Sequence, residues 1–176
     1  SQESCNILNN YLFGVNETVC EYVRLTQELD ARDTPVVLAL FGDHKPWMGN
    51  GGSVYEEMGI DFDTSTLAGF RNYYATPYLI WANRAAKEVL GADFTGDGGD
   101  FSPCFLMTRL FDACGWAGPS YMQLSRAMRD ISPLLHTNGL FLHDGVLTSV
   151  LSDTDRSFYR SWLAVQYYRE HVAAYS

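Results

Sequence analysis

The sequence predicts an α/β fold in which parallel central strands are flanked by helices, with a small antiparallel meander near the C-terminus. The first observation is an uninterrupted apolar run at residues 36–41, which is typical of a strand covered on both faces in a parallel sheet. A second apolar run at residues 78–82 follows Pro77 and predicts a strand beside or near the first. The third observation is two turn dipeptides, Asn138-Gly139 and Asp144-Gly145, which predict the meander.

Helical periodicity and capping residues predict the flanking helices. Asn16 is typical of the cap of an amphipathic helix that ends near residue 30, whereas residues 1–10 give no periodic signal and are expected to be either a frayed lead-in or the remnant of a helix whose start was cut away. Ser102 as a cap, Pro103 at the first position and Gly115 past the end agree on one mostly buried helix. Its narrow polar edge comprises Thr108, Arg109 and Asp112. Further helices are expected at residues 54–58, 85–90 and 120–131 and from 153 onward, the last packed on the sheet.

Length and composition favour a single domain over residues 1–176, since 47% of the residues are hydrophobic and can form a sizeable core. The net charge is −9 and the pI about 4.7, with Lys and Arg scattered singly, so nucleic acid is not an expected partner. The apolar runs fall short of the ~20 residues that cross a bilayer, and Ser1 does not begin a signal peptide. We therefore expect a soluble chain. Because it does not start with Met, we interpret it as a piece of a longer protein.

The four cysteines do not show the spacing of a zinc site. Cys104 and Cys114 are predicted on one helix, where ten residues place them ~15 Å apart, beyond the ~7 Å limit for a disulfide. These two are therefore not expected to bond to each other. Buried thiols are the default expectation, and the disulfide status of Cys5 and Cys20 is left open.

The residues with the clearest chemistry follow the run at 36–41. Gly42 allows a sharp turn, after which Asp43 and His44 arrive at the carboxyl end of the strand, where open α/β sheets place ligand sites. A carboxylate oxygen and an imidazole nitrogen side by side supply half of the ligands of a divalent metal that acts on phosphate or sulfate esters. The alternative is an ordinary turn.

Four segments in order resemble one known family. They are Phe41-Gly-Asp-His-Lys-Pro46, then Asn72-Tyr-Tyr-Ala-Thr-Pro-Tyr-Leu-Ile-Trp-Ala-Asn83, then Ser102-Pro-Cys-Phe-Leu-Met with Asp112-Ala-Cys-Gly115. Together they resemble the carboxyl-terminal part of the sulfatase-like phosphoglycerol transferases, the lipoteichoic acid synthase family of the alkaline phosphatase superfamily. The resemblance spans roughly residues 11–116.

The resemblance implies a partial alkaline-phosphatase/sulfatase-like fold, with the chain as the C-terminal portion of the catalytic domain. It implies that Asp43 and His44 are the last two metal ligands and that the ion is manganese. The family's nucleophilic Thr, upstream acidic ligand and upstream phosphate-binding residues have no match in residues 1–33. We therefore expect this chain alone to be inactive and to bind manganese weakly. The parent would act at the outer face of the cell membrane, anchored by upstream segments, on a phosphoglycerol-bearing lipid or polymer.

Two residues of the following glycine-rich loop are candidate substrate contacts. Lys45 could neutralise a phosphate and Trp47 could stack on a glycerol or sugar face, although an exposed Lys and a half-buried Trp need no ligand to explain them. His136 and His143 flank the first hairpin turn and could make a second metal pair, but without an acidic or thiol partner at fixed spacing a structural role is the default.

Two other functions stay open. A sulfatase proper would use the same ligands at the end of the strand, and only an upstream nucleophile separates it from the transferase. A module rich in Tyr and Trp that binds surface polysaccharide or a partner protein needs no nucleophile at all. A central strand that lacks its crossover neighbour also predicts self-association of this chain, or covering of the open edge by residues 1–13.

Overall fold

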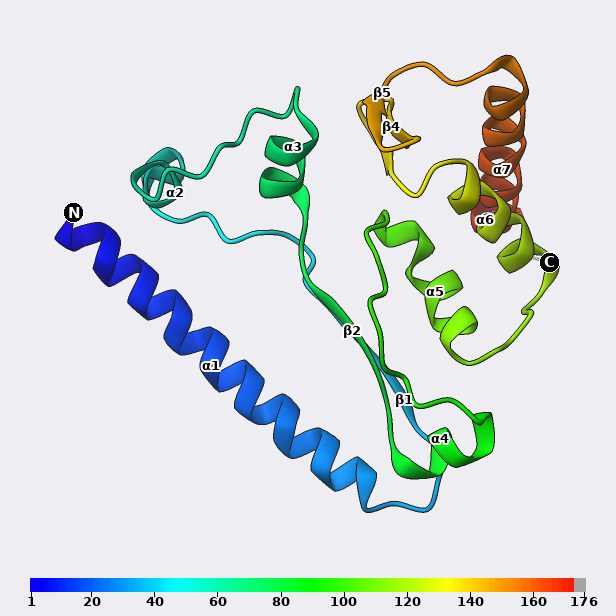
Figure 1. Cartoon of the computed structure of the whole chain (residues 1–176), viewed down its shortest axis with the longest axis horizontal. Coiled ribbons are helices and arrows are strands. Elements are labelled where there is room, and N and C mark those ends of the chain that lie inside the picture. Colours follow the sequence, from blue (N-terminus) through cyan, green and yellow to red (C-terminus); the bar gives the residue numbers. More distant parts are fainter. Residues whose placement is uncertain (173–176) are drawn as a thin grey trace. The chain divides into compact units, whose positions relative to one another are not determined.

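The computed structural model describes residues 1–172 and shows a mixed α/β chain with small antiparallel sheets (Figure 1). Two compact units divide it, the first covering Ser1–Phe94 and the second beginning at Thr95. Each unit is described separately. The expectation of one domain over residues 1–176 stays a prediction.

The first unit begins with one long helix, α1 (Gln2–Asp30). The Ser1 hydroxyl caps it by accepting from the Ser4 N–H at 3.1 Å. The frayed lead-in expected over residues 1–10 and the helix start at Asn16 are therefore wrong, whereas the alternative that residues 1–10 are part of a helix agrees with α1. No proline interrupts residues 1–30, so helix formation extends back through the polar segment to the first capping hydroxyl.

Strands β1 (Val37–Phe41) and β2 (Tyr78–Ala82) form a two-stranded ribbon (Figure 1). Their pairing confirms the prediction that the second apolar run lies beside the first. The two strands are antiparallel, with Val37 opposite Ala82 and Phe41 opposite Tyr78. Both sheets in the described residues are antiparallel. The parallel strands that the apolar run at residues 36–41 predicts beside β1 are therefore not seen in the described residues.

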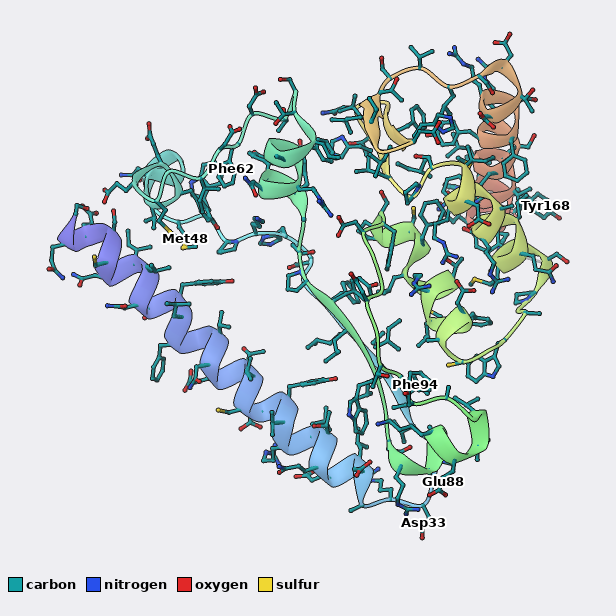
Figure 2. The ribbon with its side chains drawn as sticks, in the orientation of Figure 1. Asp33, Met48, Phe62, Glu88, Phe94 and Tyr168 are labelled. Atoms are coloured by element: carbon teal, nitrogen blue, oxygen red, sulfur yellow. The ribbon has the colours of Figure 1, made fainter. Side chains whose placement is uncertain are left out.

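The expectation that β1 is covered on both faces is wrong for the described residues. Leu40 and Phe41 are 44% and 56% exposed, and Leu79 on β2 is 45% exposed. The core of the first unit lies elsewhere, where Met48, Val54 and Tyr55 are buried against Ile7, Leu8, Ile60 and Phe62. Figure 2 shows Met48 and Phe62 near α2. A ribbon with one neighbour per strand has no second layer of side chains over these positions, so Leu40, Phe41 and Leu79 stay exposed.

Three short helices complete the first unit. Helix α2 (Ser53–Glu57) follows a 3₁₀ turn at Asn50–Gly52, and Gly59 (φ 68°) lies just past its end, as expected. Helix α3 (Leu67–Tyr74) was not predicted, although its cap is visible in the sequence, since the Thr66 hydroxyl accepts from the Gly69 N–H at 3.0 Å. Helix α4 (Arg84–Leu90) confirms the helix expected at residues 85–90.

The second unit packs helices against a small meander. Its elements are a 3₁₀ turn (Pro103–Phe105), α5 (Leu106–Ala113), α6 (Ser120–Ile131), β3 (Leu135–His136), β4 (Leu140–His143), β5 (Val146–Thr148) and α7 (Asp153–His171). The antiparallel order β3-β4-β5 confirms the meander. Phe105, Met128 and Trp162 form its buried core. Phe141 of β4 meets the ring of Tyr159 edge-on at 5.2 Å, so α7 does pack on the meander.

Two polar residues of the predicted helix at 102–115 have different roles from those expected. The Ser102 hydroxyl does not cap the helix; it accepts from the Leu135 N–H at 2.8 Å and so ties the turn to β3. Thr108 is not on an exposed edge, because it is 1% exposed and donates to the Phe105 carbonyl at 2.6 Å. A hydroxyl bonded back to its own helix can be buried at little cost. All four cysteines are free thiols, in agreement with the expectation that Cys104 and Cys114 do not bond to each other. The default expectation of buried thiols is wrong for Cys5, Cys20 and Cys104, which are exposed, and holds for Cys114.

No helix among residues 1–172 is both long and apolar enough to cross a membrane.

Candidate functional site

The end of β1 is held by its neighbour strand. The Gly42 N–H donates to the Pro77 carbonyl at 3.0 Å, and the Thr76 hydroxyl donates to the Gly42 carbonyl at 2.7 Å. A side chain at Gly42 would place its Cβ 3.1 Å from the Thr76 Cβ, so the close approach of the two chains favours glycine there. This clasp fixes where the chain leaves the ribbon, and therefore where Asp43 and His44 begin.

Asp43 and His44 lie side by side just past this clasp. The His44 Nε2 atom is 3.6 Å from the Asp43 Oδ2 atom. The other Asp43 oxygen, Oδ1, accepts from the His44 backbone N–H at 2.9 Å. The backbone therefore orients the carboxylate, and its second oxygen faces the imidazole.

The hydrogen bond on the other side of the ring sets the tautomer of His44. Its Nδ1 atom is 2.9 Å from the Lys45 carbonyl oxygen. Because a carbonyl only accepts, Nδ1 carries the proton in this contact and the lone pair of the neutral ring is on Nε2. Metal-binding histidines commonly donate their second N–H to a backbone carbonyl in this way. The lone pair of Nε2 and the Asp43 Oδ2 atom thus lie close together with no competing partner in the described chain.

The donor set of this pair suits a divalent metal ion. Its carboxylate oxygen is of the kind that Mn²⁺ prefers, and its neutral imidazole nitrogen is of the kind that Zn²⁺ and Fe²⁺ prefer. The side chains of Asp43 and His44 are 83% and 78% exposed, so an ion can reach both. Among residues 1–172, however, no group of three or more His, Cys, Asp or Glu side chains surrounds a common point. The described chain would therefore supply two ligands to a metal ion, and a closed site needs at least one more.

The loop after His44 is anchored at two positions. Met48 is 7% exposed in the core, and the Tyr55 hydroxyl donates to the Pro46 carbonyl at 2.8 Å. Trp47 lies between these anchors, and its side chain is 73% exposed. It is therefore more exposed than the half-buried Trp47 that the sequence suggested. Lys45 is half-buried and makes no ion pair within the described residues. Both side chains are available near Asp43 and His44, but the structure shows no contact that assigns them a ligand.

The second histidine pair does not form a metal site. His136 pairs with Leu140 across the β3–β4 ladder, whereas His143 pairs with Val146 across β4–β5, so the two histidines are not opposite each other. His143 instead has the adjacent Asp144 as a neighbour, with its Nε2 atom 3.7 Å from Asp144 Oδ2. Asp144 has φ 49°, which the tight hairpin turn requires. The turn explains this pair without a ligand.

One charged cluster in the second unit was missed as a group. Asp112 accepts from Arg126 Nε at 2.6 Å and from Arg129 Nη2 at 2.8 Å, and Arg109 Nη1 is 3.8 Å away. Burial alone would raise the pKa of Asp112, but the hydrogen bonds from Arg129 and Arg126 outweigh burial and hold the pKa below its usual value. The cluster joins α5 to α6 and is structural. Asp112 lies in one of the segments that resemble the sulfatase-like phosphoglycerol transferases. Its partners Arg126 and Arg129 are on α6, and only the fold brings them to Asp112.

No protein-family model matches this chain, and neither a curated protein nor a solved structure matches it.

Proposed function

We propose that this chain contributes two metal ligands, Asp43 and His44, to a manganese-dependent enzyme that transfers or hydrolyses a phosphoglycerol ester. The observation that carries the proposal is the 3.6 Å separation of Asp43 Oδ2 and His44 Nε2, with Nδ1 bonded to a carbonyl. The resemblance to the carboxyl-terminal part of the sulfatase-like phosphoglycerol transferases supplies the substrate class. In this proposal the chain is the C-terminal portion of the catalytic domain of a membrane-anchored parent, which acts on cell-surface polymer.

The roles of the chain's own residues follow from the contacts. Asp43 presents Oδ2 because the His44 N–H already holds Oδ1, and His44 presents Nε2 because the Lys45 carbonyl holds the Nδ1 proton. A manganese ion bound there would act as a Lewis acid toward the phosphoryl oxygens and toward the attacking hydroxyl. Lys45 could pair with a phosphate oxygen, and the exposed face of Trp47 could receive the glycerol carbons. The attacking group itself belongs to the remainder of the parent.

The parallel surroundings of β1 also belong to this proposal. The apolar side chains of Leu40 and Phe41 are exposed in the described chain. An intact parent would cover them if strands and helices from outside this sequence extended the ribbon into a larger, partly parallel sheet. That extension would bring the remaining ligands to the end of β1. Without it, two ligands give only weak binding and no turnover.

Manganese titration by calorimetry tests the proposal. We expect dissociation constants of roughly millimolar order for two exposed ligands, since such affinity needs only about 4 kcal/mol. Asp43→Ala and His44→Ala should each abolish the heat of binding. His143→Ala is the matched control, because His143 also has an aspartate oxygen, that of Asp144, within 3.7 Å. If His143→Ala abolished binding and His44→Ala did not, the proposal would be wrong.

Activity separates the transferase from a sulfatase. The chain alone should hydrolyse neither a chromogenic phosphodiester nor a chromogenic sulfate ester. A longer protein that includes the upstream segment should hydrolyse the phosphodiester, and Asp43→Ala should remove that activity. Turnover of the sulfate ester alone would assign the same ligands to a sulfatase.

A further inference from the structure

A groove lies at the end of the ribbon opposite to Asp43 and His44. Its volume is about 470 Å³, within the ~300–1,000 Å³ of small-molecule sites. Trp81, which pairs with Leu38 near the start of β1, lines it. The remaining lining residues come from the C-terminal end of α1 and from α4, and they are Thr26, Gln27, Asp30, Ala31 and Lys87. The groove therefore belongs to the first unit alone and is separate from the candidate metal ligands.

The walls of the groove are fixed by a buried amide. Asn83 is 0% exposed, and its Nδ2 group donates to the carbonyls of Leu29 at 3.0 Å and Thr34 at 2.9 Å. Its Oδ1 atom accepts from the N–H groups of Val36 and Ala86, each at 2.9 Å. One side chain thus joins the end of α1, the start of the ribbon and the start of α4. A groove with fixed walls loses little freedom when a ligand binds.

A second set of contacts locks the outer rim. The Arg84 N–H donates to Asp30 Oδ1 at 2.8 Å. The Arg84 guanidinium also bonds Asp33 at 3.0 Å and Glu88 at 3.1 Å, two residues that Figure 2 labels at this end of the unit. Asp30 therefore keeps a fixed position, with one oxygen bonded to the backbone and the other free to accept.

Three side chains of the lining have unused hydrogen-bonding groups. In the part of the chain that the structure describes, Trp81 Nε1, the Gln27 amide and the Lys87 ammonium have no hydrogen-bond or ion-pair partner. The Trp81 ring also stacks on no other aromatic ring there, although it is half-buried. An indole ring and unused donor and acceptor groups therefore line the groove.

The charges of the groove select the ligand class. Asp30 and Lys87 carry opposite charges and both line the groove, so their sum favours neither a strong anion nor a strong cation. The C-terminal end of α1 adds the negative end of a helix dipole, which disfavours phosphate further. An indole face suits an apolar surface of C–H groups, while the amide, carboxylate and ammonium suit hydroxyls that both donate and accept. We infer that this groove binds one neutral sugar ring, stacked on Trp81 and hydrogen-bonded by Gln27, Asp30 and Lys87.

This inference does not rest on the proposed function. It adds a sugar-binding site at the end of the β1–β2 ribbon that is opposite to Asp43 and His44. The two sites can be examined in one protein, because variants of Trp81 and of His44 affect different ends of β1 and β2.

The indole N–H signals in a ¹H–¹⁵N NMR spectrum test the site directly. The chain has four tryptophans, so the Trp81 signal can be assigned by its loss in Trp81→Phe. The probes are methyl α-glucoside, methyl β-galactoside and N-acetylglucosamine, with sodium phosphate as the anionic probe. At least one sugar should shift the Trp81 signal saturably, with a dissociation constant of about 1–10 mM, as expected for a small open groove.

Variants of the rim then test the assigned contacts. Gln27→Ala and Lys87→Met should each weaken the sugar at least threefold, and Trp116→Phe, which removes an indole that is 46% exposed and lies outside the groove, should leave its affinity unchanged. Gln27 is exposed on α1 and its substitution should not affect folding, so this variant remains informative if others unfold. If none of the three sugars gave a saturable shift up to about 100 mM, the inference would be overturned, because a dissociation constant above that concentration does not indicate a specific site. So would unchanged affinity in Gln27→Ala and Lys87→Met, or a Trp81 shift that phosphate saturates at lower concentration than any sugar.

Discussion

The side-chain amide of Asn83 donates to the Leu29 carbonyl at 3.0 Å and so joins the end of α1 to residues 54 positions later. Asn83→Ala should lower the free energy of unfolding of the first unit by about 3 kcal/mol, because buried N–H and C=O groups of the backbone lose their partner. Urea unfolding followed by NMR signals of the ribbon measures it. Asn72→Ala is the matched control, since Asn72 makes one amide hydrogen bond, to the Asp61 carbonyl. An equal loss in both variants would contradict the central role of Asn83.

Asp112 gives the second unit a defined pH dependence. Its pKa is lowered in the folded chain, because the hydrogen bonds of Arg129 and Arg126 outweigh burial. The ion pairs therefore contribute full stability above the unfolded pKa of about 3.9, and this contribution is lost as the pH falls through the lower folded pKa. Asp112→Asn should cost about 2 kcal/mol at pH 7 and much less at pH 2. A loss that is the same at both pH values would show that the charge is not responsible.

Cys114 should react more slowly than Cys5 and Cys20. Cys114 is 5% exposed and burial raises the pKa of its thiol, whereas Cys5 and Cys20 are exposed on α1. Iodoacetamide at pH 8 should label Cys5 and Cys20 first and Cys114 only after unfolding, because the thiolate is the reactive form. Peptide mass spectrometry of timed samples measures the order. A disulfide between Cys104 and Cys114 in native protein would contradict the structure of the second unit.

The ribbon should promote self-association. The Asn83 N–H donates to the Val36 carbonyl, and the Gly42 N–H donates to the Pro77 carbonyl. Because every second residue of an antiparallel strand bonds to its neighbour, the backbone N–H and C=O groups of Val37, Ala39 and Phe41 point away from β2. Such an open edge pairs readily with another strand. Sedimentation at increasing concentration should show dimers, and Ala39→Pro should reduce them by removing one edge N–H. Ala39→Val is the control that keeps this group. A monomer at all concentrations would count against the prediction.

Local signals explain what could be predicted from the sequence. The turn dipeptides at 138–139 and 144–145, Pro119 just before α6 and the apolar runs of β1 and β2 each act within a few residues, and these elements were found. The direction of the β1–β2 pair could not be predicted, since an apolar run does not record which way its neighbour runs. The start of α1 was missed because helix propagation extends through polar residues once a cap is present.

The two candidate sites also differ in whether neighbouring residues or only the fold brings their members together. Asp43 and His44 are adjacent, so their common position follows from the sequence, and the structure adds the tautomer and the orientation of the carboxylate. The groove depends on residues 27, 81 and 87, which only the folded chain brings together. No spacing rule could have joined them.

The most direct test of the central claim is the effect of Mn²⁺ on the four histidine ring signals in a proton NMR spectrum. A paramagnetic ion broadens signals of the residues that bind it. The account predicts that, at substoichiometric Mn²⁺, the His44 signals broaden first, that Asp43→Ala prevents this, and that His136, His143 and His171 keep their line widths. Selective broadening of His143, or equal broadening of all four, would contradict the assignment of Asp43 and His44 as metal ligands.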